Sequence, residues 1–143
     1  MTNEENINFT FGLGHDLHRA SQHADDIFAA AASHVDLTAR QLTVLEIIAQ
    51  TEKPSQMDIC LHSGIDRSTV ADMVLRLMKK GYVERRRSRS DARRYALQLT
   101  DAGRAVLEIA RPIARDVEAK VASALPSCNL EQFIADLRGI TRD

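Results

Sequence analysis

The segment from Ile65 to Tyr95 gathers side chains that bind polyanions. It holds ten cations and four anions, a net charge of +6, whereas the rest of the chain holds nine cations and sixteen anions, a net charge of −7. Guanidinium and ammonium groups gathered on one surface neutralise the phosphates of a nucleic acid. A charge run that is merely solvated is the alternative, but the compactness of this cluster favours a polyanion-binding surface.

The first half of this segment predicts a helix with one polar face. Asp66 is a capping residue, and the helical pattern continues to Lys80, after which Gly81 ends it. At 100° per residue, the apolar face holds Val70, Met73, Val74, Leu77 and Met78. The opposite face is free to enter a major groove, and it holds Ser68, Thr69, Asp72, Leu75, Arg76 and Lys79.

The two ends of this helix suit different contacts. Arg67, Ser68 and Thr69 lie at the N-terminal end, which normally approaches base edges. A bidentate pair between arginine and guanine contributes about 1–3 kcal/mol of discrimination. Arg76 and Lys79 lie further along the helix, so we expect them to contact phosphates.

A short basic hairpin is predicted after the helix. Its strands are Tyr82 to Arg87 and Tyr95 to Leu99, and the second strand alternates apolar and smaller or polar residues as a half-buried strand does. The tip, Ser88 to Ala92, is polar and basic. A hairpin of this kind reaches an adjacent minor groove, whose negative potential attracts arginine. The arginines expected to act there are Arg85, Arg87, Arg89, Arg93 and Arg94.

A second short helix must position the first. Ser55 is a capping residue for a helix over Gln56 to Ser63, and Gly64 supplies the tight turn that leads to Asp66. Ser55 and Gln56 belong to the predicted DNA-contacting set. The side chains that we expect this helix to turn inward are Met57, Cys60 and Leu61.

Longer helices flank this unit. We expect them over Leu13 to His34, Ala39 to about Gln50, Thr100 to about Ala124, and from Asn129 to near Ile140. Thr38 and Gln41 form a capping box for the second of these helices. Pro112 falls inside the third, which predicts a kink or a break near Ala110.

Several segments, in order and with matching gaps, resemble the MarR family of multiple-antibiotic-resistance-type regulators. The resemblance covers Thr38 to Gly103. It is carried by Leu37-Thr38-x-x-Gln41-x-x-Val44-Leu45, by Asp66-Arg67-Ser68-Thr69-Val70, by Leu77-Met-Lys-Lys-Gly81-Tyr-Val83-Glu-Arg85, and by Asp91-x-Arg93 followed by Leu99-Thr100-x-x-Gly103.

The resemblance implies a mainly α fold with a small β-hairpin wing, a winged helix-turn-helix with N- and C-terminal dimerisation helices. Residues 1–37 and 101–143 would form the dimerisation arms and residues 38–100 the DNA-binding lobe, all within one structural unit. The implied partners are a second copy of the chain and a pseudo-palindromic operator in double-stranded DNA. Arg93 would reach the DNA and Asp91 would hold the wing. The full predicted set is Ser55, Gln56, Arg67, Ser68, Thr69, Asp72, Arg76, Lys79, Arg85, Arg87, Arg89, Asp91, Arg93 and Arg94.

Two residues depart from the family pattern on the groove-facing side of the predicted helix. Asp72 stands where a basic or neutral residue is common, and Leu75 where a polar residue is common. Asp72 either accepts from a cytosine amino group or orients Arg76, and Leu75 suits a thymine methyl group. Because of these two departures, the sequence does not decide which bases the helix contacts.

The resemblance also implies an effector pocket between the arms and the lobe, which often takes a small aromatic acid. Arginine and histidine suit its carboxylate, or the phosphates of a CoA thioester. Plain surface or interfacial polarity is the alternative for each candidate residue. The candidates are His15, His18, Arg19, Arg40, Arg111 and Arg115.

Composition and motifs narrow the classes of protein to which this chain can belong. The chain of 143 residues is 44% hydrophobic and 27% charged, which is ordinary for a globular protein, and no apolar run approaches a membrane span. The N-terminal sequence lacks the pattern of a signal peptide, and only Cys60 and Cys128 are present, so we expect a cytoplasmic protein. Phosphate-loop, zinc-protease and nucleophile-elbow motifs are absent, so we expect no enzyme and no cofactor.

Three alternatives remain within the same fold. His15 and His18 share a helix face, but no neighbouring cysteine or carboxylate completes an obvious zinc site, so we predict no metal. Cys128 falls in a polar loop and His62 lies near Cys60, which keeps a redox-responsive regulator open. A winged helix that binds protein or RNA is the third alternative, because the fold does not dictate the partner.

Overall fold

The computed structural model describes residues 10–87, 89, 95–125 and 129–142. The elements follow in the order α1 (Leu13–Ala31), α2 (Ala39–Gln50), α3 (Gln56–Ser63), α4 (Arg67–Lys79), β1 (Val83–Arg87), β2 (Tyr95–Leu99), α5 (Asp101–Ser123) and α6 (Leu130–Ile140). The strands pair antiparallel, with Val83 opposite Leu99 and Arg87 opposite Tyr95. The predicted mainly α fold with a small hairpin is therefore confirmed.

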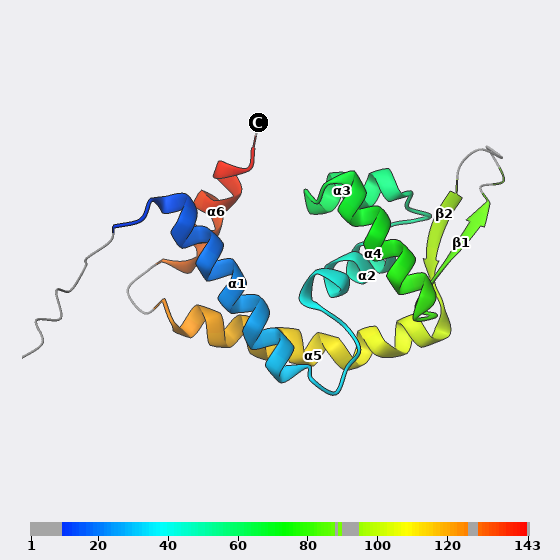
Figure 1. The fold of residues 1–143 in the computed structure, drawn as a ribbon, viewed down its shortest axis with the longest axis horizontal. Coiled ribbons are helices and arrows are strands. Elements are labelled where there is room, and N and C mark those ends of the chain that lie inside the picture. The colour runs from blue at the N-terminus through cyan, green and yellow to red at the C-terminus, as the bar shows by residue number, and fades with distance from the viewer. Residues whose placement is uncertain (1–9, 88, 90–94, 126–128, 143) are drawn as a thin grey trace, which may run out of the picture.

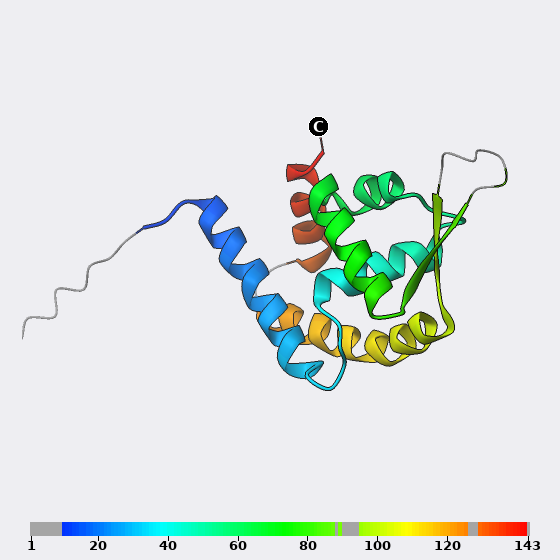
Figure 2. The same ribbon diagram turned by 45° about the vertical axis from the view of Figure 1, so that its right-hand side comes forward.

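The long helix α5 connects the two ends of the molecule (Figure 1). α1 and α6 lie at one end, and α2, α3, α4 and the hairpin lie at the other. α1 and α2 both pack on α5. The turned view in Figure 2 again shows the hairpin projecting at the end away from α1. The basic elements are thus separated from the two terminal helices.

Capping side chains begin the helices after α1 at the predicted places. The Gln41 backbone N–H donates to Thr38 Oγ1 at 3.2 Å, and the Thr38 N–H donates to Gln41 Oε1 at 3.2 Å. Ser55 and Asp58 form the same reciprocal box at the start of α3. Each cap satisfies backbone donors that have no partner within the first turn of a helix. Asp66, Thr100 and Asn129 likewise cap α4, α5 and α6.

The core lies where α2, α3 and α4 meet the hairpin and α5. Burial of a leucine or isoleucine side chain stabilises the fold by about 1.5–3 kcal/mol. Gln41 is the one buried polar side chain among the described residues. The largest fully buried side chains are those of Val44, Leu45, Pro54, Ile59, Val70, Val74, Leu77 and Leu97.

Three expectations about the helices need correction. α1 ends at Ala31, three residues before the predicted His34, and a turn follows. Of the expected kink or break near Ala110, the break is absent, because α5 continues through Pro112 as one helix, whose ribbon is bowed in Figure 1. The predicted inward face of α3 was wrong for Met57 and Leu61, which are exposed, whereas Cys60 is half-buried against the core. Ile59 is the buried residue of this helix.

Candidate nucleic-acid interface

α4 presents the predicted polar face to solvent. Val70, Val74 and Leu77 are fully buried against the lobe, as the 3.6-residue periodicity predicts. Thr69 is half-buried, so it lies at the margin of the outward face. The residues of the predicted face that are exposed are Ser68, Asp72, Leu75, Arg76 and Lys79.

The N-terminus of α4 is held by Asp66. Its carboxylate accepts from the Thr69 hydroxyl at 2.6 Å and from the Thr69 backbone N–H at 3.3 Å. The hydrogen bond from the Thr69 side chain lowers the pKa of Asp66 below its usual value. The Thr69 hydroxyl is therefore engaged in capping, whereas Arg67 is exposed, with Nη2 3.9 Å from the sulfur of Met57.

Asp72 and Arg76 form an ion pair on the outward face. Arg76 Nε donates to Asp72 Oδ2 at 2.8 Å, and both side chains are more than half exposed. An exposed pair of this kind contributes little to stability. It does fix the direction of the guanidinium, and of the two interpretations of Asp72 it matches the one in which Asp72 orients Arg76.

The wing is attached to the helix-turn-helix through Arg85. Its Nη2 donates to Gln56 Oε1 at 3.0 Å, which joins β1 to the first turn of α3. Further along the hairpin, the Arg87 guanidinium lies 6.0 Å from the centre of the Tyr95 ring, and Arg89 is exposed. The structure thus brings Gln56 and Arg85 together. Asp91, Arg93 and Arg94 lie outside the described residues.

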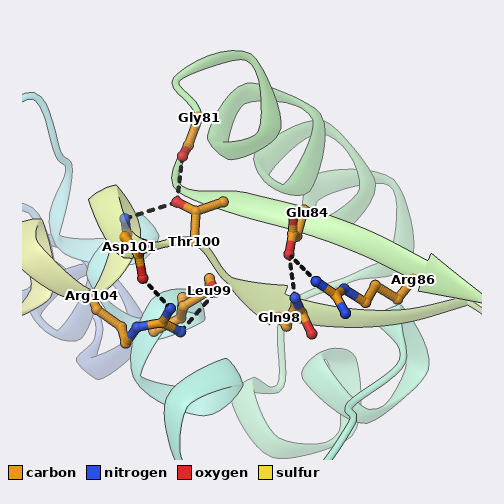
Figure 3. A network of polar contacts seen from close by, with 9 residues as sticks. Gly81, Glu84, Arg86, Gln98, Leu99, Thr100, Asp101 and Arg104 are labelled. Atoms are coloured by element: carbon orange, nitrogen blue, oxygen red, sulfur yellow. Dashed lines mark hydrogen bonds and ion pairs between the residues drawn. The ribbon is translucent and has the colours of Figure 1, made fainter.

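The base of the wing is fastened to α5 by a polar network (Figure 3). Thr100 Oγ1 donates to the Gly81 carbonyl at 2.5 Å and accepts from the Gly103 N–H at 3.0 Å. Arg104 Nη1 donates to the Leu99 carbonyl at 3.0 Å. These bonds join the end of α4, β2 and the start of α5. The wing and α4 are therefore both fixed to the first turn of α5.

Lys80 contacts residues of the protein's own body, and these contacts were not predicted from the sequence. Its Nζ lies 2.9 Å from Asp36 Oδ1 and donates to the Asp36 carbonyl at 3.0 Å and to Gln41 Oε1 at 3.1 Å. Lys80 therefore ties the C-terminus of α4 to the first turn of α2. The partners are 39 and 44 residues away in sequence, so no local pattern indicates this contact.

A cleft of about 480 Å³ lies between α1, α2 and α5. Apolar side chains, among them Phe28, Leu42 and Val117, form part of its lining. Among the described residues, Arg40, one of the predicted effector residues, is the only cation that lines it, beside the carboxylates of Asp25, Glu46 and Glu118. A ligand with one negative charge would therefore find a single cationic anchor on this chain's side of the cleft.

Arg111 and Arg115 line an adjoining hollow rather than this cleft. Arg111 Nε donates to Glu46 Oε1 at 2.8 Å and Arg111 Nη1 to Glu108 Oε1 at 2.6 Å. The hydrogen bond from Arg111 lowers the pKa of Glu46 below its usual value, and that from Glu46 raises the pKa of Arg111. Arg111 is thus already neutralised by two carboxylates.

The remaining predicted effector residues lie near the start of α1. His15, His18 and Arg19 are exposed, whereas the α1 residues that line the cleft are Ala24, Asp25 and Phe28, further along the helix. The His15 ring lies 4.3 Å from that of Phe11, centre to centre. The protomer does not bring these three residues into the cleft.

The two terminal helices carry apolar side chains that this chain leaves exposed. No residue of α6 is buried. On α6 the apolar residues recur at helical spacing, which is the pattern of a face that packs on another element. The exposed apolar residues of these helices and of the segment before α1 are Phe11, Leu13, Leu130, Phe133, Ile134 and Ile140.

Within the described ranges, no three histidine, cysteine, aspartate or glutamate side chains are grouped so as to hold a metal ion. Cys60 is half-buried on α3, and Cys128 lies outside the described residues. None of the helices described is long and apolar enough to cross a membrane.

Known proteins share both the sequence pattern and the fold. Residues 35–94 match the model of the MarR family. The HTH-type transcriptional repressor NicR of Pseudomonas putida is 29% identical over 105 residues, which span 73% of this chain and 66% of NicR.

Two solved structures extend the likeness over almost the whole chain. The transcriptional repressor CouR, bound to a 23-mer DNA duplex, is 31% identical, with a TM-score of 0.82 over 92% of this chain and 93% of that one. Bordetella bronchiseptica BpsR, in a structure concerned with the regulation of its DNA binding by 6-hydroxynicotinic acid, is 26% identical. Its TM-score is 0.84, over 94% of this chain and 96% of that one.

Proposed function

The chain belongs to the MarR family, and from this premise we propose that it is a sequence-specific transcriptional repressor. In this proposal it binds a pseudo-palindromic operator in double-stranded DNA as a homodimer. A small aromatic acid, or its CoA thioester, releases it from the operator. The protein acts in the cytoplasm, where the DNA is, and has no enzymatic activity of its own.

The outward face of α4 is the observation that carries the DNA-binding part. Arg67, Arg76 and Lys79 are exposed on a helix that is anchored on its other side by three fully buried side chains, so its cations are held outward. A major groove is about 12 Å wide and admits one such helix. Arg85 and Arg89 extend the basic surface along the wing, toward the phosphates or the minor groove beside it.

The exposed apolar side chains of the terminal helices support the homodimer. Residues 1–37 and 101–143 form the proposed arms, and residues 38–100 the lobe. Phe133 and Ile134 on α6 are exposed in the single chain, and so is Leu13 on α1. A second copy would cover these side chains, and its two-fold axis would set two recognition helices against two half-sites.

The cleft between α1, α2 and α5 supports the effector part. Its volume of about 480 Å³ suits a small organic molecule, and its lining is largely apolar with Arg40 as anchor for a carboxylate. BpsR, whose DNA binding is regulated by 6-hydroxynicotinic acid, has a closely similar fold. A ligand that favours a different spacing of the two recognition helices would release the DNA by a population shift.

A selection from a random-sequence DNA library tests the DNA-binding part. The intact protein is expected to enrich a pseudo-palindrome whose half-site centres lie about 10 base pairs apart, one turn of the duplex. Recovery of no common sequence would contradict the proposal and would favour a protein-binding winged helix.

Release of the selected duplex tests the effector part. 6-Hydroxynicotinic acid and related aromatic acids are added to the complex, and at least one is expected to lower the affinity for the duplex. Arg40→Ala should retain the duplex at concentrations of the acid that release the wild type. Arg138→Ala, which replaces an exposed arginine on α6, serves as the matched control. If the acid released the duplex equally from all three proteins, Arg40 would be excluded as the anchor.

A further inference from the structure

One apolar side chain stands in the middle of the polar face of α4. At 100° per residue, Ser68, Asp72, Leu75 and Lys79 form its central stripe, directly opposite the buried Leu77. Leu75 is 48% exposed, and it is the one large hydrophobic residue of α4 that is exposed. Among the described residues, Leu75 is not one of those that pack against the buried core.

The polar groups next to Leu75 are already paired with each other. Asp72, one turn before Leu75, accepts from Nε of Arg76, the next residue along the chain, at 2.8 Å. This pair cancels the charge beside the leucine and holds the Arg76 guanidinium against the Asp72 carboxylate. A helix that enters a groove with this face forward would therefore present an apolar spot at its centre.

The major groove offers one methyl group to such a spot. Every base edge presents hydrogen-bond donors or acceptors there, and thymine alone adds a C5-methyl group. A leucine pressed against donors or acceptors would remove them from water without giving them a partner, which is unfavourable. Against a methyl group the same leucine buries apolar surface on both sides.

We propose that Leu75 reads the C5-methyl group of a thymine in each half-site. This inference rests on the proposed DNA-binding function and names one base that the site selects. It makes Leu75 a specificity-determining residue, whereas Asp72 acts through Arg76 as a positioning residue.

Replacing a single thymine by uracil in the selected duplex tests the contact, because it removes the methyl group and nothing else. Burial of one such carbon contributes about 0.8 kcal/mol, which corresponds to about a fourfold change in affinity. At one thymine position of each half-site, replacement by uracil should weaken binding of the wild type about fourfold. Leu75→Ala should bind the two duplexes equally.

Ile109→Ala provides the matched control, because Ile109 is an equally exposed apolar residue on α5. This variant should keep the full fourfold preference for thymine. A preference that survives in Leu75→Ala, or a selected half-site without a required thymine, would overturn the inference while leaving the proposed function intact. Failure to select any sequence would instead overturn the proposed function.

Discussion

Gly103 is the residue whose substitution has the most direct structural consequence. It lies in the first turn of α5, where a Cβ added to it would meet the Tyr82 carbonyl oxygen at 2.0 Å and the Tyr82 carbonyl carbon at 2.9 Å. Both neighbours are backbone atoms, and the same oxygen accepts from the Thr100 N–H at 3.0 Å. Gly103→Ala must therefore separate the start of α5 from the end of α4.

The expected cost follows from three contributions. Overpacking of this kind costs about 1–3 kcal/mol, and weakening of the hydrogen bond between Thr100 and Tyr82 adds about 1 kcal/mol. Alanine regains about 0.5–1 kcal/mol because it favours the helix more than glycine does. The net expectation is a loss of about 2 kcal/mol in the free energy of unfolding.

Urea unfolding, followed by circular dichroism at one fixed protein concentration, measures this loss. Gly14→Ala is the matched control, since a Cβ at this helical glycine of α1 meets nothing within 4 Å. We expect the control to be as stable as the wild type or slightly more stable. A Gly103→Ala protein as stable as the control would refute the close approach between α5 and Tyr82.

Three further predictions concern binding, pH dependence and assembly. Arg67→Ala should weaken binding to the operator alone and relax the preference at one base pair. Arg89→Ala should weaken binding to every duplex and flatten the salt slope by about 0.9. Equal losses of affinity on operator and random DNA for both variants would contradict these roles. Glu46→Gln should cost up to about 1 kcal/mol at neutral pH, because Arg111 loses its carboxylate partner. The pKa of Glu46 is lowered from 4.5 in the folded protein, so its contribution is present above pH 4.5 and is lost as the pH falls through the folded value; a difference between wild type and variant that is the same at pH 3 and pH 7 would contradict this. Phe133→Glu should turn the dimer into a monomer in sedimentation at micromolar concentration, and a dimeric variant would exclude α6 from the interface.

The helix-turn-helix was predictable because local signals define it. Thr38 with Gln41, Ser55 and Asp66 cap helices through side chains three residues from their partners, so sequence spacing is sufficient to place them. The periodicity of α4 is equally local, and it assigned both faces correctly. Gly81, at φ 78°, ends that segment as predicted.

The predictions fail where tertiary contacts determine which side chains are buried or paired. α3 has only two turns, too few for a clear periodicity, and its packing against α2 and α4 determines that Ile59 rather than Met57 or Leu61 is buried. The contacts of Lys80 were not predicted, because Asp36 and Gln41, its partners, come from a distant part of the chain. The cleft likewise depends on how three helices pack, which a linear pattern does not contain.

The measurement that tests the account most directly is a fluorescence anisotropy titration of the intact protein into the selected duplex and into a scrambled duplex of the same composition. We predict an affinity for the selected duplex at least about 10³-fold higher at physiological salt, and a steep fall in affinity as salt rises. Equal affinity for the two duplexes, or binding insensitive to salt, would contradict a sequence-specific DNA-binding function for this protein.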